Sequence, residues 1–379
     1  MRALNWRWPS VDDMLAPRAN NLTALRLAAA VCVVVSHCAL LKIGVQEAEP
    51  LAGVMIFTLG EHALHAFFYI SGLTIAASLV RADSYFEFAV ARALRIWPAL
   101  MVVTIVLAVV AGPLLGRLAP AEYFADPGWK TYIASGLLLS SSGLSLPGLF
   151  VDNPHLPIAD GSPWTLKYEV ICCAAITLGA LAISGRAALR SSTWVMAATL
   201  ASAFYMVVLP PGARETHLDH VMRMWFAFGL GVITWQFAAK LRPSLLILAG
   251  IGIDLYLSLG TALERPLSIV FVGALVLVLA AMPAGAMRVW TNRTDLSYGL
   301  YITAWPVTQA LVERWPDMPL WAVTLATLAI ATALAYLSWT LVEKPAMAMK
   351  PFVVRLARLL HLAPRHVALP RPMQHSFST

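Results

Sequence analysis

Two ionisable residues interrupt the first strongly apolar stretch of the chain. Arg26 and His37 both lie within residues 22–41, and eleven positions separate them. Because an α-helix turns by about 100° per residue, eleven steps make three turns with about 20° to spare and rise about 16 Å. The two side chains therefore leave the same helix face. A charged group inside a bilayer is costly and usually faces a protein interior or a water-filled path, so the pair predicts a functional site.

Four further segments carry groups suited to chemistry or to close helix packing: Phe67–Gly72 (FFYISG), Arg92–Pro98 (RALRIWP), Ser162–Glu169 (SPWTLKYE) and Ser297–Tyr301 (SYGLY), the last followed by Trp305-Pro306 and Glu343-Lys344-Pro345. Ser71 and Gly72 are small enough to let two helix backbones approach closely. Arg92 and Arg95 share a helix face, where two guanidinium groups would form a clamp for phosphate oxygens. Anchoring at the positively charged inner side of a membrane explains the two arginines equally well.

In this order, and across nearly the whole chain, the set resembles the membrane acyltransferase family 3, whose members O-acylate cell-surface polysaccharides and related glycans. The match lies in the Arg-x10-His spacing of Arg26 and His37, the FF-x-x-SG stretch, the paired arginines before Trp-Pro, the Trp-Thr-Leu-x-x-Glu segment and Ser-Tyr-Gly-x-Tyr. The chain departs from the family at one point. Where members often read Leu-Tyr-Leu-Trp-His-Trp-Pro, it has Ala304 instead of the histidine, which leaves open whether the acceptor differs.

The resemblance implies a role for each of these residues. Acyl-CoA, the donor substrate, is cytoplasmic and carries phosphates, for which Arg92 and Arg95 would form the cationic dock, with Arg26 deeper in. An alcohol is a poor nucleophile at neutral pH, so His37 would act as its base or would itself carry the acyl group. Glu169 would hold the imidazole tautomer, which makes His37, Glu169 and Arg26 the expected catalytic residues. The expected substrate-binding residues are Trp164, Tyr298, Tyr301, Ser71 and His65.

The reaction that the family implies is transfer of an acyl group, with acetyl favoured, from cytoplasmic acyl-CoA to a hydroxyl of a cell-surface polysaccharide or related glycan. An extended acyl arm would span the distance of about 16 Å along the helix between Arg26 and His37. No metal is expected to take part.

The composition predicts a helical membrane protein. Of the 379 residues 59% are hydrophobic and 12% are charged, against about 25% charged in soluble domains. Apolar stretches of about 20 residues are long enough to span a bilayer. They predict an all-α polytopic bundle of about ten transmembrane helices near 22–41, 63–80, 96–116, 165–183, 193–209, 221–239, 244–260, 266–283, 297–313 and 319–342, the third and ninth interrupted by Pro98 and Pro306.

The distribution of Lys and Arg predicts the orientation, because cytoplasmic loops carry an excess of them. With the N-terminus inside, eighteen fall on inner segments and seven on outer ones. We therefore expect a cytoplasmic segment 1–21, a transmembrane acyltransferase domain 22–345 and a basic cytoplasmic tail 346–379, in a bacterial cytoplasmic (inner) membrane. The net charge of +7 reflects this topology in the lipid bilayer and does not indicate nucleic-acid binding.

One long connection, 117–163, falls on the outer side and is expected to be functional or disordered because of its length. It contains a short apolar piece, 133–139, which is expected to be re-entrant or interfacial. The tail after residue 345 is expected to form a basic helix on the inner leaflet and to be disordered beyond residue 364.

Other classes of function remain open. Intramembrane Arg, His and Glu also suit a proton-coupled transporter of a glycan precursor or small solute, although no internal repeat is present. A non-catalytic partner of a polysaccharide assembly complex is a third class. Glu61-His62-x-x-His65 has a spacing seen in helical metal sites but lacks a further ligand nearby. Four cysteines in expected helices are expected to pack as small apolar residues, and nothing indicates the oligomeric state.

Overall fold

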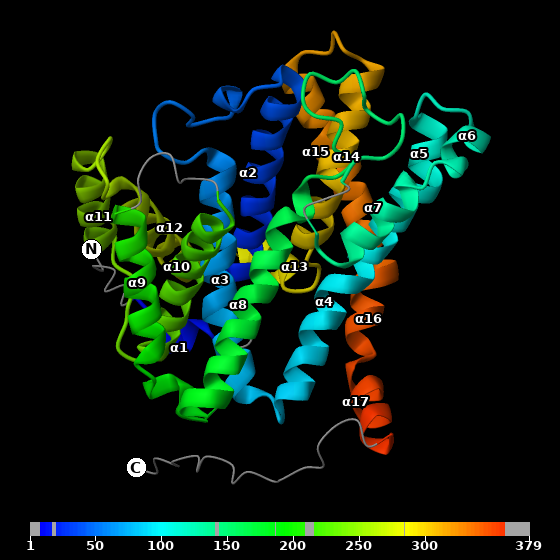
Figure 1. Ribbon diagram of the computed structural model, residues 1–379. Coiled ribbons are helices and arrows are strands. Elements are labelled where there is room, and N and C mark those ends of the chain that lie inside the picture. The colour runs from blue at the N-terminus through cyan, green and yellow to red at the C-terminus, as the bar shows by residue number, and fades with distance from the viewer. Residues whose placement is uncertain are drawn as a thin grey trace.

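A computed structural model describes residues 8–16, 20–140, 144–185, 187–208, 216–283 and 285–360. Over this part of the chain the secondary structure is helical and no β-strand forms, as the hydropathy pattern predicts. The longer helices run side by side as one bundle (Figure 1). We call the end with the loops on either side of α5 (Gly112–Leu115) and α6 (Pro120–Ala125) the upper end. The lower end has α17 (Lys350–Leu359) and the turn between α3 (Leu59–Arg81) and α4 (Tyr85–Val106).

The helices are α1 (Val11–Met14), α2 (Leu22–Ile43), α3 (Leu59–Arg81), α4 (Tyr85–Val106), α5 (Gly112–Leu115), α6 (Pro120–Ala125), α7 (Gly128–Leu137), α8 (Leu166–Gly179), α9 (Trp194–Val208), α10 (His217–Gln236), α11 (Leu245–Leu257), α12 (Glu264–Ala281), α13 (Gly285–Thr291), α14 (Ser297–Arg314), α15 (Leu320–Ser338), α16 (Lys344–Ala348) and α17 (Lys350–Leu359). A helix occupies each of the ten ranges expected to be apolar spans. Six of them are long and apolar enough to cross a membrane: 22–43, 59–81, 85–115, 162–183, 264–281 and 320–359. The chain is thus a helical membrane protein, and the number of crossings stays a prediction.

Two helices are longer than the sequence indicated. α4 begins at Tyr85 instead of residue 96, so the paired arginines lie inside it, and it continues through Pro98. α14 likewise continues through Pro306, so neither proline breaks its helix. The last helix passes through a π-helical turn at Trp339–Glu343 and runs on as α16 and α17, which makes the expected basic tail a direct extension of α15 down to Leu359. The residues beyond 360 lie outside the described ranges.

α3 is the centre of the bundle and packs most extensively against α10. Two glycines allow this approach. A Cβ atom on Gly72 would overlap the carbonyl oxygen of Phe228, and one on Gly231 would overlap the carbonyl oxygen of Tyr69. The Ser-Gly pair of α3 therefore does what its residue types predict, because only a missing side chain lets the two backbones come so close.

The long upper connection is partly helical and packs on α4. A π-helical turn at Leu107–Ala111 extends α4, and the hydroxyl of Tyr123 in α6 donates a hydrogen bond of 2.7 Å to the carbonyl of Ala108 in this turn. The apolar piece expected to be re-entrant or interfacial belongs to α7, and Trp97 of α4 donates to the Leu137 carbonyl. The connection is therefore a packed part of the fold.

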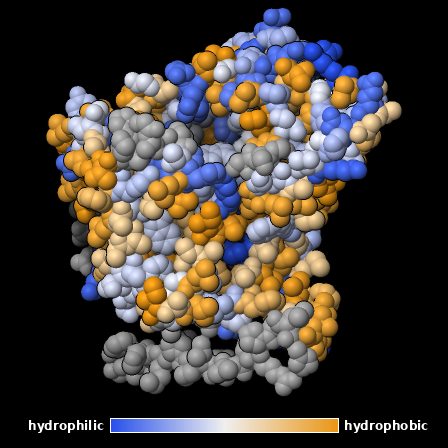
Figure 2. All heavy atoms as spheres, viewed as in Figure 1, coloured by the Kyte–Doolittle hydropathy of each residue, from blue (hydrophilic) through white to orange (hydrophobic). Residues whose placement is uncertain are grey.

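Apolar residues cover most of the middle and lower part of the face in Figure 2, while hydrophilic residues gather at the top and upper right. Two arginines that the charge count assigned to outer segments are instead buried in helices. Arg223 of α10 pairs with Glu61 of α3, and Arg265 of α12 pairs with Asp219 of α10 at 2.7 Å. A buried cation needs such a partner, because its desolvation is otherwise uncompensated.

Candidate active site

The five sequence motifs meet in one cavity, which we call the arginine cavity. It has a volume of about 80 Å³ and is lined by Arg26 from α2, Leu64, Phe67, Phe68 and Ser71 from α3, Arg92, Arg95 and Ile96 from α4, Thr165, Leu166 and Glu169 from the start of α8, and Ser297, Tyr298 and Tyr301 from α14. Segments up to 275 residues apart in the sequence thus form one site. This convergence supports the ordered set of motifs as a functional unit.

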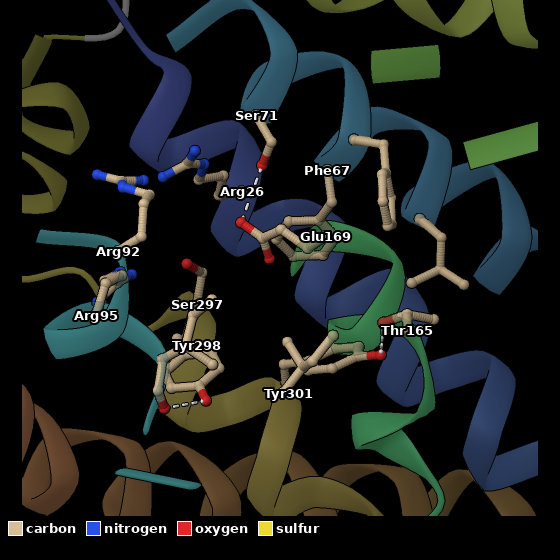
Figure 3. Close-up of a pocket in the computed structure, with 14 residues that line it drawn as sticks. Arg26, Phe67, Ser71, Arg92, Arg95, Thr165, Glu169, Ser297, Tyr298 and Tyr301 are labelled. Atoms are coloured by element: carbon tan, nitrogen blue, oxygen red, sulfur yellow. Dashed lines mark hydrogen bonds between the residues drawn. The ribbon is translucent and has the colours of Figure 1, made fainter. Parts of the chain in front are cut away.

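Charged groups of both signs face one another across this cavity (Figure 3). The guanidinium of Arg26 donates to the Thr74 hydroxyl at 3.3 Å, and the Ser71 hydroxyl lies 3.5 Å from the Glu169 carboxylate. Among the described residues Arg92 forms no ion pair, and its guanidinium lies 6.0 Å from the Phe88 ring. Arg26 and Arg92 therefore keep charge available for an anionic ligand.

Arg95 forms ion pairs with two carboxylates of the protein. Its two terminal nitrogens lie 2.6 Å from Asp295 and 2.8 Å from Glu343, and its guanidinium stacks 5.6 Å from the Tyr298 ring centroid. The π-helical turn at the end of α15 carries Glu343, whose second oxygen accepts from Ser338. Arg95 thus joins α4 to α14 and α15, which differs from the sequence-based picture of two equivalent phosphate-binding arginines.

The two tyrosines of α14 use their hydroxyls to hold the site together. Tyr298 donates to the backbone carbonyl of Ile96 at 2.7 Å, and Tyr301 donates to the carbonyl of Ser162 and lies 2.6 Å from the Thr165 hydroxyl. Both line the arginine cavity, so their expected place in a substrate-binding site fits. Arg95 covers one face of the Tyr298 ring.

A second cavity lies toward the upper end and contains His37, so we call it the histidine cavity. Its volume is about 420 Å³, and its lining includes His37, Trp305, Trp164, His155, His220, Arg223, Glu49 and Glu61. The His37 ring meets the Trp305 indole edge to face, with centroids 4.8 Å apart. The Ser36 hydroxyl donates to Glu49, and burial raises the pKa of the Glu49 carboxyl. Two indoles and several polar groups suit a carbohydrate, which stacks on aromatic faces through its C–H groups.

Two expected placements are wrong. Glu169 lines the arginine cavity and bonds to Ser71, whereas His37 lines the histidine cavity, so the carboxylate does not hold the imidazole as expected. The reason is that the 3₁₀ turn Ser162–Thr165 precedes α8, so Glu169 lies in the first turn of α8, which lines the same cavity as Arg26. His65 lines neither cavity; it is fully buried and packs against Phe57.

Glu61, His62 and His65 have a spacing that is also seen in helical metal sites. Glu61 pairs with Arg223 instead, and no group of three or more His, Cys, Asp or Glu side chains suited to a metal occurs over the described ranges. All four cysteines fall within described helices and are unpaired, and Cys38, Cys172 and Cys173 are buried.

The two cavities share one residue. Leu64 of α3 lines both, and it is 7% exposed. The position lies one turn above Phe68 on α3, between the levels of Arg26 and His37. A single apolar side chain therefore stands at the boundary between the arginine and histidine cavities.

A third cavity opens beside Arg26 at the lower end. It measures about 230 Å³ and is lined by Arg26, Arg81, Asn20, Asn292, Thr23, Thr74, Leu15, Ala16, Leu22 and Ala77. Arg26 thus borders two cavities. No sequence motif pointed to Arg81 or Asn292, which lie at helix ends, or to His155, which is a lone histidine in the long loop.

The fold and the site together define a helical membrane enzyme with a cationic cavity and an imidazole-containing cavity in line along one bundle. The profile of a family described as "Acyltransferase domain" matches residues 20–340. The chain therefore belongs to this family, acyltransferase family 3, and is an O-acyltransferase.

Two relatives extend over nearly the same length. An "O-acetyl transferase" of Shigella phage Sf6 is 27% identical over 343 residues, which cover 86% of this chain and 96% of the relative. "Nodulation protein 10" of Rhizobium leguminosarum bv. viciae is 29% identical over 381 residues, which cover 91% of this chain and 97% of the relative. No solved structure matches significantly.

Proposed function

We propose that the protein moves an acetyl group from cytoplasmic acetyl-CoA to a hydroxyl of a cell-surface polysaccharide or related glycan. The observation that carries this proposal is the adjacency of the two cavities at Leu64, with the arginines on one side and His37 on the other. The phage relative's name supports acetyl as the group and oxygen as the acceptor atom.

In this proposal the donor enters from the lower end. Its phosphates meet Arg26 and Arg92, which are not engaged by carboxylates, and the cavity beside Arg81 offers further cationic and amide groups. A guanidinium binds phosphate oxygens through two parallel N–H donors, which fixes position as well as charge. The acyl arm then extends past Leu64 toward His37.

At the upper end His37 meets the acyl group and the acceptor. It acts either as the base that takes the hydroxyl proton or as the residue that carries the acyl group briefly. Trp164 and Trp305 would hold the sugar rings in the histidine cavity. Glu169 is reassigned to the donor side, where its carboxylate faces Arg26 and orients the Ser71 hydroxyl.

The proposal places the lower end in the cytoplasm of a bacterial inner membrane, with about ten crossings and both termini inside. The excess of Lys and Arg on the segments expected to be inner supports this orientation.

Radiolabelled acetyl-CoA tests the function. Membranes of cells that produce the protein are incubated with the label, and the surface polysaccharide is extracted, counted and examined by NMR for ester groups. We expect label in the glycan for the wild type and for Arg190→Ala, a control that removes an exposed arginine. His37→Ala and Arg26→Ala should abolish the signal. Solute flux without label in the glycan would indicate a transporter instead, and full activity of either variant would refute the assignment.

A further inference from the structure

A segment of the long upper connection reaches into the histidine cavity and carries a histidine that none of the motifs contains. His155 lines the cavity together with His37, and both rings contact the same indole. The centroids of His155 and Trp305 are 5.9 Å apart, and those of His37 and Trp305 are 4.8 Å apart. Trp305 therefore has one imidazole from α2 and one from the loop beside it.

Hydrogen bonds from α14 hold this loop segment in place. Gln309, which is fully buried, donates to the carbonyls of Leu156 and Ile158, both at 3.2 Å. The Trp305 indole N–H donates to the same Ile158 carbonyl at 3.0 Å. On the other side of the histidine, the Asn153 amide donates to the Gln309 backbone at 2.9 Å and to its side-chain oxygen at 2.7 Å.

These contacts bracket the histidine on both sides. Five hydrogen bonds to two residues of α14 hold 153–158 in place, three through backbone carbonyls and two through the Asn153 side chain, although the segment has no regular secondary structure. The partners of the buried Gln309 amide are the Leu156 and Ile158 carbonyls and the Asn153 side chain, all in this loop. A buried amide that loses its partners is costly, so the loop is held in that place. The fold thus uses a buried side chain to keep His155 at the cavity wall, while the His155 ring itself is only half-buried.

We propose that His155 is a second catalytic imidazole, which contacts the acceptor hydroxyl and takes its proton, and that Gln309 is its positioning residue. This inference rests on the proposed acyl transfer. The hydroxyl oxygen attacks the acyl carbon and forms the new C–O bond, and its proton passes to a neutral ring nitrogen of His155. His37 carries the acyl group in this step: the bond between the acyl carbon and the His37 nitrogen breaks, and the electron pair stays on that nitrogen.

The other imidazoles of the region are less suited to this step. The ring of His220 lines the same cavity, but its Nδ1 lies 3.3 Å from the Arg223 guanidinium and the ring packs on Trp164. A proton is taken up less readily beside a fixed cation. The residue that replaces the family's usual histidine, Ala304, is buried in a cluster with residues of α2 and α15 and lines neither cavity.

The loss of activity in His155→Ala measures the proposed role. General base catalysis contributes about 10²–10⁴-fold, so we expect the rate of acetyl transfer from labelled acetyl-CoA to the surface polysaccharide to fall at least about 10²-fold. The KM for acetyl-CoA should stay unchanged, because the donor cavity is intact. Added imidazole should restore part of the rate, because the shortened side chain leaves room in a cavity of about 420 Å³.

Three further variants separate catalysis from folding. Gln309→Ala should lower the turnover rate without raising the donor KM, because it releases the loop but leaves the imidazole in the protein. Val151→Ala, an exposed position of the same loop, should be as active as the wild type. His155→Gln keeps a polar side chain of similar reach and should remain as inactive as the alanine variant.

The outcomes distinguish the two levels of inference. If wild-type membranes place no label in the polysaccharide, the proposed transfer from acetyl-CoA to this glycan is wrong, and the role of His155 in it falls as well. If the wild type is active and His155→Ala or His155→Gln transfers acetyl at the wild-type rate, only the second imidazole is refuted. A large loss in properly folded His155→Ala that imidazole does not rescue, together with a raised donor KM, would also overturn the proposal, because it would indicate a structural effect on the donor side.

Discussion

Replacing Arg95 with methionine tests whether this arginine holds helices together or binds the donor. Its guanidinium bridges Asp295 and Glu343 at 2.6 and 2.8 Å, and the Glu343 side chain is 1% exposed. Removing one partner of a buried ion pair costs about 3–5 kcal/mol, because the remaining charge is left uncompensated. We expect Arg95→Met to lower the free energy of unfolding by about 3–5 kcal/mol. The loss should not be doubled by the second carboxylate, because the Asp295 side chain is 16% exposed and still accepts a hydrogen bond from Ser297.

The matched comparison is a triple variant, Arg95→Met with Asp295→Asn and Glu343→Gln. It removes the cation and both anions, and replacing a complete buried ion pair by neutral groups is often without cost. The purified triple variant should therefore unfold at a higher temperature than Arg95→Met when both are measured in the same detergent. Both should be assayed for acetyl transfer well below their unfolding temperatures.

Arg92→Met provides the contrast within the same helix. Arg92 has no ion pair among the described residues, so we expect its loss to change stability by less than about 1 kcal/mol. Its guanidinium lines the arginine cavity, so the KM for acetyl-CoA should rise. Equal destabilisation by the two single variants, or a triple variant no more stable than Arg95→Met, would refute the division of roles.

Three further predictions concern other parts of the fold. Leu64→Trp should stop acetyl transfer while acetyl-CoA still binds, because a larger side chain closes the boundary of the two cavities; transfer at the wild-type rate would show that the acyl group takes another route. Gly72→Ala should lose about 1–3 kcal/mol in thermal unfolding, because the added Cβ overlaps the Phe228 carbonyl. Burial raises the pKa of Asp160 to about 8, whereas an unfolded Asp titrates near about 3.9. Between these values the native protein binds more protons, so the wild type should gain stability as the pH falls from 8 toward 4. Asp160→Asn should lack this gain, and identical pH profiles of unfolding would contradict the assignment.

The sequence alone predicted the helical membrane class and a helix in each of the ten ranges expected to be apolar spans. This is possible because burial in lipid demands long apolar runs whose backbone groups bond within the helix. It also predicted that a neighbouring helix backbone lies close to Gly72, because a residue without a side chain in an apolar helix leaves room for such an approach. The family membership followed from five short motifs whose order the chain preserves.

The ends and internal breaks of the helices were harder to predict. Pro98 and Pro306 were expected to interrupt their helices, but both helices are continuous through the proline within the packed bundle. The start of α4 was placed eleven residues late, because its first turns carry charged residues and their burial depends on α14 and α15. A charged residue in a helix is expected at the protein surface when only the sequence is known. It can be buried when an oppositely charged residue from a distant part of the chain pairs with it.

The sequence by itself determined that the chain forms a helical bundle and which reactive groups it carries: Arg26, His37, two further arginines and a carboxylate in a recognisable order. Only the tertiary structure decided which of these groups meet. It separated Glu169 from His37, committed Arg95 to two carboxylates, and brought His155 to the cavity from a loop. The physical reason is that spacing along one helix fixes directions within that helix, whereas pairing between helices depends on crossing geometry, π-helical turns and loop contacts, which act over hundreds of residues and leave no local pattern.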